Sequence, residues 1–339
     1  MKFNIAYAPD DKYINQTIVS MVSAIENNKE HEIEFIIIYS KLSEESVEKL
    51  KQTIAPTRFS NLQGEASQVE KLPSPTERVS LRLLQTDENI FSSLPLSHWV
   101  TVQAWFRIKL PDMCPDLDKI LYLDCDTLIL GDLSELFSTN LDGKFLAGVK
   151  DVWGVDRYCK RLSMASGVYV NSGMLLFNAD FCRKENFFDK IVEFANNNAK
   201  IIEFCDQDSI NKIADEKKVV LNPKFNLMDT WWRGGYYEFD GEEEQEYLTA
   251  KEKPVIAHLT GLKPAFKGSG NKFKDKWWEY AKLTPIYEEL VKDYENSKPP
   301  KEPLKDKIFS IKNRYEGKTK LKILTILGLK FVLSKRKYK

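Results

Sequence analysis

Strand-like and helix-like segments alternate along the N-terminal part of the chain. Residues 2–8 and 33–39 are short, almost wholly apolar runs, as expected of buried parallel strands. Between them, residues 15–27 carry apolar side chains at helical spacing, and Ser43 is placed to cap a second helix. This order of elements predicts a parallel sheet whose strands are joined by right-handed helical crossovers. The predicted fold class is therefore α/β.

The later segments extend this pattern. We expect strands over residues 79–84, 119–123, 145–150, 173–178 and 254–258, and helices over residues 100–110, 181–197, 206–214 and 272–294. The polar segment 59–77 contains two prolines and is predicted to be an exposed loop, with a linker at residues 297–300. With 339 residues, the chain can form one large domain and an appendage. We place the main domain at residues 1–270 and a helical, basic extension at residues 271–339.

Composition narrows the class of protein. Lys and Arg together number 50, as do Asp and Glu, so there is no net charge that would attract nucleic acid. The five cysteines are scattered without a C-x-x-C pair, which argues against a disulfide framework and a thiolate zinc site. We find neither a signal sequence nor an apolar run long enough to span a bilayer. These features predict a cytoplasmic protein in a reducing compartment.

Two carboxylates, Asp124 and Asp126, directly follow the apolar segment 120–123. In open α/β sheets, ligands bind at the carboxyl ends of the strands. Two oxygen ligands there suit Mg²⁺ or Mn²⁺, which can share its other positions with phosphate oxygens. The alternative is an Asp-containing turn in which one carboxylate caps the next segment. The apolar strand before the pair supports a metal site as well as it does the capping turn, so both interpretations stay open at this point.

A second candidate segment is His258-Leu259-Thr260-Gly261-Leu262-Lys263-Pro264. His258, at a strand end, is a candidate third metal ligand. Gly261 would let the backbone approach a phosphate, and Lys263 would supply positive charge to it. The alternative is a core histidine followed by an ordinary Gly-Pro loop.

Three further features carry candidate site residues. Asn171-Ser172-Gly173 precedes a predicted strand, and Asp206-Gln207-Asp208 begins a predicted helix. Structural alternatives are a tight turn for the first and a capped helix N-terminus for the second. Arg107 lies on an otherwise apolar and aromatic helix, where it either packs its stem on the sheet or points at a ligand.

In this order, the features resemble glycosyltransferase family 8, which includes bacterial galactosyl- and glucosyltransferases of lipopolysaccharide synthesis and the glycogenins. The resemblance covers residues 2–270. It begins with Ile5-Ala6-Tyr7-Ala8-Pro9-Asp10-Asp11-Lys12-Tyr13, similar to the family's first strand and uridine-binding turn, and continues with Trp105-Phe106-Arg107-Ile108. The D-x-D pair, the Asn171 and Asp206 motifs and His258-x-x-Gly261-x-Lys263-Pro264 complete it.

The resemblance implies a GT-A fold, Rossmann-like with a mixed sheet, and transfer that retains the anomeric configuration. By correspondence of motifs, it assigns the uridine to Ala8, Asp10, Lys12 and Tyr13, manganese to Asp124, Asp126 and His258, and the diphosphate to Gly261 and Lys263. Cys125 joins the donor-binding set, and the sugar and reacting face fall to Arg107, Asp151, Asn171, Asp206 and Gln207. Three positions depart from the family: Trp105 replaces tyrosine, Lys12 replaces asparagine, and Ala265 replaces a tryptophan that packs the loop over the diphosphate.

The expected reaction is Mn²⁺-dependent transfer of a hexose from UDP-galactose or UDP-glucose to a hydroxyl of a glycan or glycolipid. Because the amide of Gln207 is a poor nucleophile, we favour front-face displacement, with Asp206 as the rival nucleophile. One alternative is a metal-dependent nucleotidyltransferase of similar build. The acidic turn after the first strand lacks the glycines that such an enzyme uses to bind phosphates. The other alternative is a non-catalytic nucleotide-sugar-binding protein.

The C-terminal extension is strongly basic from Lys301 onward. Residues 321–333 interleave apolar side chains with lysines, in a run shorter than the roughly 20 residues needed to cross a bilayer. Such a segment suits the surface of an anionic membrane, where lysines meet lipid headgroups. We therefore expect peripheral attachment at the cytoplasmic face, where a lipid-linked acceptor would lie. The alternative is a terminal helix packed on the main domain.

Overall fold

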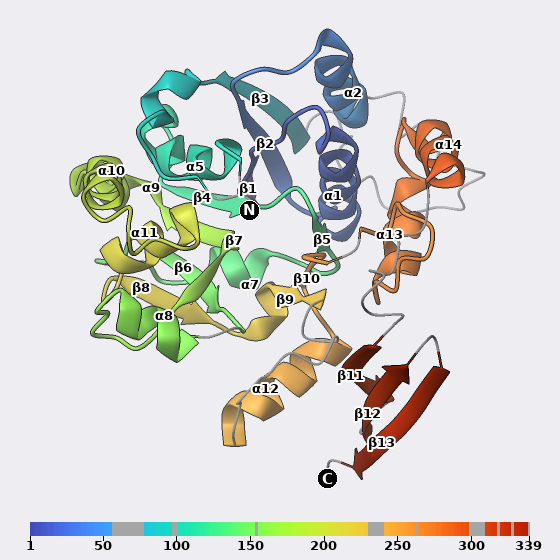
Figure 1. Ribbon diagram of the computed structural model, residues 1–339. Coiled ribbons are helices and arrows are strands. Elements are labelled where there is room, and N and C mark those ends of the chain that lie inside the picture. Colours follow the sequence, from blue (N-terminus) through green and yellow to red (C-terminus); the bar gives the residue numbers. More distant parts are fainter. Residues whose placement is uncertain are drawn as a thin grey trace.

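A seven-stranded mixed sheet forms the centre of the molecule (Figure 1). The computed structural model describes residues 1–55, 78–96, 101–152, 155–229, 241–261, 263–297, 309–316, 319–326 and 329–337. The strand order is β3-β2-β1-β4-β7-β6-β8. The strands are β1 (Lys2–Tyr7), β2 (Glu32–Tyr39), β3 (Val79–Gln85), β4 (Lys119–Leu123), β6 (Leu146–Lys150), β7 (Val170–Asn178) and β8 (Lys218–Leu221). The α/β class predicted from the sequence is confirmed.

Only β7 runs against its neighbours in this sheet. It pairs antiparallel with β4 and β6, whereas β1, β2, β3 and β4 are parallel to one another. Because β7 is reversed, its first residues lie beside the carboxyl end of β4, with Met174 opposite Leu123. Asn171, Ser172 and Gly173 therefore belong to a strand, and the alternative of a tight turn before the strand is wrong.

Helices cover both faces of the sheet (Figure 1). One face carries α1 (Ile14–Asn27), α2 (Glu44–Ile54), α13 (Lys274–Ala281) and α14 (Tyr287–Asn296). The other carries α5 (Gln103–Phe106), α9 (Ala179–Lys184), α10 (Phe187–Asn197) and α11 (Cys205–Ile213). Successive side chains of a strand point to opposite faces, so Phe3 and Ile5 join the first core and Ala6 joins the second.

A three-stranded sheet, β5-β10-β9, adjoins the main one. It consists of β5 (Thr127–Ile129), β9 (Leu227–Met228) and β10 (Ile256–His258). The antiparallel register of β10 and β5 sets His258 opposite Thr127. This pairing brings the second candidate segment of the sequence to the D-x-D pair.

Several predicted helices are divided in the structure. The helix expected over residues 181–197 becomes α9 and α10, because Asn186 adopts a left-handed conformation with φ of 52°. The helix expected to end before Pro111 instead continues through η2 (Arg107–Lys109) and α6 (Leu110–Met113), since proline is tolerated in a helix's first turn. The charged segment 272–294 forms two helices, α13 and α14.

The remaining helices are short or peripheral. They are η1 (Glu88–Phe91), α7 (Ser134–Phe137), α8 (Val155–Arg161), η3 (Pro223–Phe225) and α12 (Gly241–Glu252). The loop predicted at residues 59–77 and most of the predicted linker lie outside the described residues.

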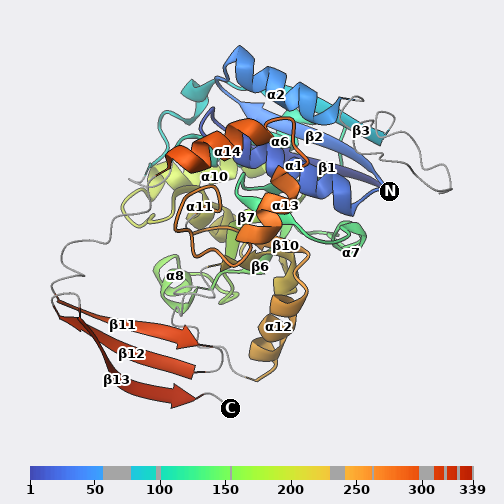
Figure 2. The same ribbon diagram turned by 90° about the vertical axis from the view of Figure 1, so that its right-hand side faces the viewer.

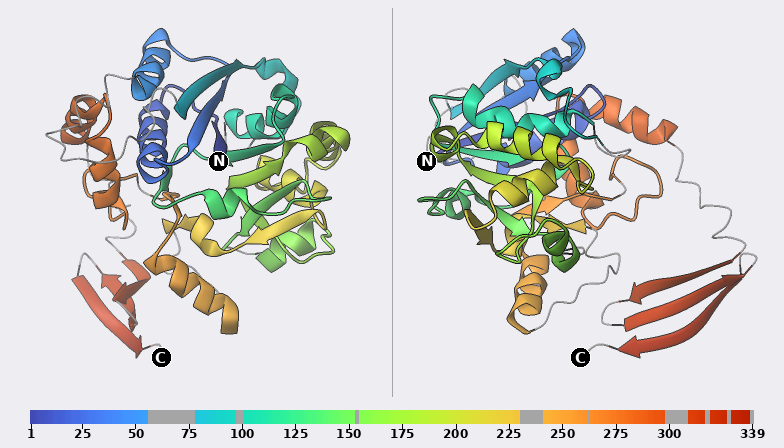
Figure 3. Two further views of the ribbon diagram at one scale, coloured as in Figure 1. Left: turned by 180° about the vertical axis from the view of Figure 1, so that it is seen from behind. Right: turned by 60° about the vertical axis from the view of Figure 1, so that its left-hand side comes forward.

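The C-terminal extension is helical only as far as Asn296. The described residues beyond it form an antiparallel sheet of β11 (Phe309–Glu316), β12 (Thr319–Ile326) and β13 (Leu329–Lys337), shown beside the main body in Figures 2 and 3. The helix expected here is wrong. Lysines and large aliphatic residues alternate with a period of two over residues 320–323, which favours a strand. Among the described helices, none has the length and apolar character needed to cross a membrane.

Candidate active site

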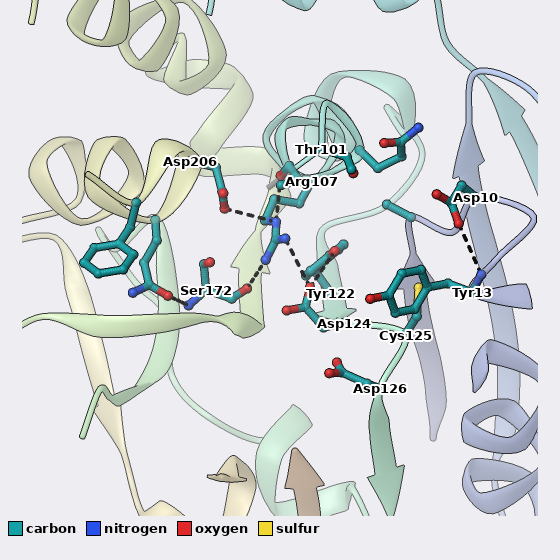
Figure 4. A pocket seen from close by; sticks show the side chains of 15 residues that line it. Asp10, Tyr13, Thr101, Arg107, Tyr122, Asp124, Cys125, Asp126, Ser172 and Asp206 are labelled. Carbon is teal, nitrogen blue, oxygen red and sulfur yellow. Dashed lines mark hydrogen bonds and ion pairs between the residues drawn. The ribbon is translucent and has the colours of Figure 1, made fainter. Parts of the chain in front are cut away.

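A cleft opens at the carboxyl ends of β1 and β4. The chain proceeds outward from β1 to β3 and then returns to β4 on the other side of β1, which is where open α/β sheets bind ligands. The cleft has a volume of about 310 Å³ (Figure 4). Nine predicted site residues line it: Ala8, Asp10, Tyr13, Arg107, Asp124, Cys125, Asp126, Asp206 and Gln207. It is also lined by Thr101, Gln103, Ala104, Tyr122, Ser172 and Phe204.

Asp124, Asp126 and His258 converge at one side of this cleft. The Nε2 atom of His258 lies 3.7 Å from Oδ2 of Asp124 and 3.3 Å from Oδ1 of Asp126. One ligand atom from each residue lies within 4.8 Å of the other two. Backbone hydrogen bonds hold the group: Leu259 N donates to Asp126 O (2.8 Å) and Asp124 N donates to the carbonyl of a β7 residue, also at 2.8 Å.

Gly173 is the residue of β7 that receives the bond from Asp124, and its lack of a side chain makes room for the cluster. A Cβ atom built on Gly173 would lie 2.2 Å from Cε1 of His258 and 2.7 Å from Oδ2 of Asp124. Both distances are below van der Waals contact, so any larger residue would displace a ligand. The glycine of the Asn171 motif therefore serves the D-x-D site directly.

The charges of this cluster compensate one another. Burial lowers the pKa of His258, but the adjacent Asp126 outweighs this effect and raises the pKa above its ordinary value. Burial raises the pKa of Asp126, but the positive charges of His258 and Lys263 outweigh burial. They hold the pKa of Asp126 far below its usual range. The ammonium of Lys263 contacts Asp126 and also donates to the Leu259 carbonyl at 2.8 Å.

The donor set fits a divalent cation. The two carboxylates are oxygen ligands that suit Mn²⁺ or Mg²⁺, and the imidazole favours a transition-metal ion such as Mn²⁺. Neighbouring ligands of an octahedral ion with bonds of about 2.1 Å lie about 3 Å apart, near the separations of 3.3 and 3.7 Å between His258 and the acids. The side chains of His258 and Asp124 occupy the space that the absence of a Cβ atom on Gly173 leaves free.

Arg107 forms the centre of a second cluster (Figure 4). The side chain is buried, with Nη2 lying 3.1 Å from Oδ1 of Asp124 and Nε lying 3.2 Å from Oδ2 of Asp206. It also donates to the Ser172 carbonyl at 2.5 Å, and its guanidinium stacks 4.3 Å above the Tyr122 ring. Arg107 thus points into the site, which resolves the choice left open by the sequence.

Asp206 and Gln207 face the same cleft from α11. Burial raises the pKa of Asp206 to about 6, although Arg107 opposes the shift. The Gln207 oxygen accepts from Ser172 N at 2.8 Å and from Asn171 Nδ2 at 3.2 Å. The Gln207 amide nitrogen donates to Asp151 at 3.1 Å, and Asn171 donates to the same carboxylate oxygen at 3.1 Å. Asp151 and Asn171 therefore adjoin the cleft through Gln207.

Asp208, to which the sequence assigns no role, holds the turn before these two residues. It is fully buried and accepts hydrogen bonds from the backbone N–H groups of Glu203 (2.7 Å) and Phe204 (3.0 Å). Arg161 and the Tyr169 hydroxyl also donate to it. The turn contains Cys205 at φ of 41°, a strained conformation for a residue with a side chain.

The residues predicted to contact a nucleotide lie at the other end of the cleft. Oδ1 of Asp10 accepts from the backbone N–H groups of Lys12 (3.0 Å) and Tyr13 (3.1 Å). These two bonds fix the turn that presents Tyr13, a residue that is 42 % exposed. Lys12 is exposed and lies outside the lining of the cleft.

Asp229 was not found from the sequence, yet it shapes the loop that carries Gly261 and Lys263. Oδ1 accepts from Thr260 Oγ1 at 2.8 Å and from Gly261 N at 2.9 Å. No motif marks a lone buried aspartate, so only the fold could identify it.

Known proteins resemble this chain in sequence and fold. The family profile described as "Glycosyl transferase family 8" matches residues 4–265. General stress protein A of Bacillus subtilis is 24 % identical over 287 residues, covering 83 % of this chain and 93 % of the relative. A lipopolysaccharide 1,2-glucosyltransferase of Escherichia coli is 26 % identical over 320 residues, covering 91 % and 87 %. The crystal structure of the galactosyltransferase LgtC with donor and acceptor sugar analogs superposes with a TM-score of 0.71 at 22 % identity, covering 86 % of this chain and 100 % of that one.

Proposed function

This chain belongs to glycosyltransferase family 8, and on that basis we propose that it transfers galactose or glucose from a UDP-sugar to a hydroxyl of a glycan or glycolipid, with retention and with Mn²⁺. The mixed sheet between two layers of helices is the GT-A fold expected from the sequence. Mg²⁺ would serve the same ligands.

The convergence of Asp124, Asp126 and His258 beside Gly173 carries this proposal. His258 comes from a part of the chain distant from Asp124 and Asp126, yet one ligand atom of each residue lies within 4.8 Å of the other two. When bound there, a divalent cation would neutralise the charge that develops on a departing diphosphate. Lys263, already beside Asp126, would supply a second positive charge to the same group.

The residues on the other side of the cleft would orient the sugar. Arg107 is pinned by Asp124, Asp206 and the Ser172 carbonyl, so its position is set before a substrate arrives. Gln207 is fixed by Asn171, Asp151 and the Ser172 N–H. Because these polar groups are already oriented, they need not rearrange when the sugar develops positive charge, which lowers the free energy of the transition state.

Two observations support front-face displacement over a covalent intermediate. The Gln207 oxygen already accepts two hydrogen bonds, which further weakens it as a nucleophile. The Asp206 carboxylate is buried and ion-paired with Arg107, which makes it less available as a nucleophile. The acceptor hydroxyl would then attack on the side from which the diphosphate departs, and a phosphate oxygen would take its proton.

Release of UDP from a panel of UDP-sugars, with and without Mn²⁺, tests the proposal. We expect hydrolysis of UDP-galactose or UDP-glucose that depends on the metal and is lost in Asp124→Asn. Release of pyrophosphate from a nucleoside triphosphate would instead indicate the nucleotidyltransferase alternative. Binding of UDP-sugar without turnover, even with added glycan acceptors, would indicate the non-catalytic alternative.

We also propose that the C-terminal sheet attaches the enzyme peripherally to an anionic membrane, where a glycolipid acceptor would be within reach. Register pairs Leu324 with Phe331 and Ile326 with Leu329, so these four apolar residues share one face. Leu329 is 66 % exposed and Phe331 49 %. The neighbouring lysines of the tail would add about 1 kcal/mol each near anionic headgroups.

A further inference from the structure

A relay of side-chain hydrogen bonds joins His258 to the sugar side of the cleft through Asn226. This asparagine follows η3 and is fully buried, with 0 % of its surface exposed. Its Oδ1 lies 3.0 Å from Nδ1 of His258, and its Nδ2 lies 3.0 Å from Oδ1 of Asn171. From Asn171 the relay continues to Gln207 and Asp151.

Backbone groups fix the direction of this relay. Gly173 N donates to Oδ1 of Asn171 at 3.0 Å, and Ser172 N donates to Oε1 of Gln207 at 2.8 Å. A backbone N–H can only donate, so the atoms that face these two groups must be amide oxygens. Neither Asn171 nor Gln207 can therefore be turned over without leaving a buried N–H facing an NH₂ group.

The orientation of Asn226 follows from that of Asn171. Since Asn171 presents an oxygen, Asn226 must present its NH₂ group to that oxygen. The carbonyl of Asn226 then faces Nδ1 of His258, which must carry a proton to donate to it. In the neutral ring the other nitrogen, Nε2, keeps its lone pair, and Nε2 is the atom that lies near Asp124 and Asp126.

We infer that Asn226 is a positioning residue that holds His258 in the Nδ1–H tautomer, directs its Nε2 lone pair at the divalent cation, and ties that ligand to the sugar-side residues Asn171 and Gln207. The second partner of a metal-ligating histidine sets its tautomer and ring orientation. Here that partner is a neutral amide that is oriented through Asn171, whose own orientation is fixed by the backbone N–H of Gly173. The claim that a cation binds here rests on the proposed function, whereas the tautomer of His258 is a property of the chain itself.

Nitrogen-15 NMR of the histidine rings tests this inference in the full-length protein. The chain has only three histidines, so His258 can be assigned with the variant His258→Asn. In metal-free protein, at a pH where the ring is neutral, we expect Nδ1 to show the protonated shift and Nε2 the unprotonated one. Addition of Mg²⁺, which is diamagnetic, should then move the Nε2 signal.

Variants of Asn226 separate positioning from mere packing. Asn226→Leu removes both hydrogen bonds and should abolish the tautomer preference and weaken Mg²⁺ and Mn²⁺ binding by about 10–100-fold. Asn28→Leu is the matched control, because Asn28 is also buried and makes two side-chain hydrogen bonds, to Ala24 and Leu133, neither of which involves His258. It should leave the tautomer and metal affinity unchanged.

Asn226→Asp keeps an acceptor for His258 and loses the donor to Asn171. It should retain the tautomer of the neutral ring while lowering kcat for the sugar transfer. Observation of the Nε2–H tautomer in the unmodified protein would overturn the inference without any variant. Unchanged tautomer and metal affinity in folded Asn226→Leu would also overturn it. The tautomer is measured without donor or metal. Its result therefore stands even if the proposed transfer reaction fails, and the two failures can be told apart.

Discussion

The backbone of Gly173 passes so close to the ring of His258 that a methyl group on the glycine would lie 2.2 Å from Cε1. Gly173→Ala should therefore push His258 away from the acids and weaken Mn²⁺ binding by about 10–100-fold, as loss of ligand orientation does in other metal sites. Calorimetric titration with Mn²⁺ measures the effect. Gly270→Ala is the matched control, since a Cβ atom there meets nothing within 4 Å. Equal affinities for the two variants would contradict a role for Gly173 at the metal site.

Loss of one metal-binding carboxylate should remove turnover while preserving the fold. Asp126→Asn removes one negative charge from the site and should weaken its hold on the cation. The transition state would then lose several kcal/mol of charge stabilisation, slowing sugar transfer by about 10³-fold or more. Steady-state transfer with saturating Mn²⁺ provides the measurement, and circular dichroism provides the folding control. Near-normal turnover in both Asp124→Asn and Asp126→Asn would rule out the metal assignment.

Metal affinity should rise with pH. The folded-state pKa of His258 lies above its ordinary value because Asp126 outweighs the effect of burial, and the cation needs the unprotonated ring. Below that raised pKa, each unit of acidification should weaken Mn²⁺ binding about tenfold, whereas the affinity levels off above it. Asp126 contributes no slope, because its pKa is held far below this range. Titrations between about pH 5.5 and 8.5 would reveal the slope, which His258→Asn should abolish.

The transferred sugar should keep the α configuration of the donor. Gln207→Ala removes an orienting amide and should slow transfer by about 10²-fold, a loss typical of one preorganised polar contact. Proton NMR of early product reports the anomer, and a β product would refute retention. In Asp206→Ala, rescue by azide with formation of a glycosyl azide of inverted configuration would identify Asp206 as a nucleophile and exclude front-face displacement.

Removal of the residues after Pro300 should release the protein from anionic vesicles. The C-terminal sheet and its lysines would be lost, whereas the cleft and the helices that cover the main sheet would remain. Co-sedimentation with vesicles at low salt measures attachment, and Mn²⁺-dependent UDP release reports on the intact cleft. A double variant, Leu329→Ser with Phe331→Ser, tests the apolar face alone. If full-length protein fails to bind such vesicles, membrane attachment is wrong.

The acids of the proposed metal site could be found from sequence because their signal is local. Asp124 and Asp126 follow an apolar strand directly, and the carboxyl end of a strand is where such a sheet binds ligands. Arg107 and His258 could not be identified from local sequence alone, because the segment around each is equally compatible with a residue packed in the core. The family resemblance selected them. In the structure Arg107 lines the cleft, and His258 lies beside Asp126.

Other parts could not be predicted because they depend on pairing between distant segments. Nothing in residues 170–178 reveals that β7 is antiparallel, yet this reversal delivers Gly173 to Asp124. Asn226 and Asp229 are buried polar residues whose partners come from other strands and loops, so no local pattern marks them. In the tail, the helical expectation gave too little weight to the two-residue alternation of lysine with leucine and isoleucine.

The pairing of β10 with β5 has a consequence for biosynthesis. His258 follows Asp126 by 132 residues (258 − 126). At about 5–20 residues per second, a ribosome takes about 7–26 s to add the histidine after the aspartate. Throughout that interval the nascent chain carries two closely spaced acids without the imidazole that would complete the proposed metal site, so a cation would be captured tightly only after the last quarter of the polypeptide has begun to emerge.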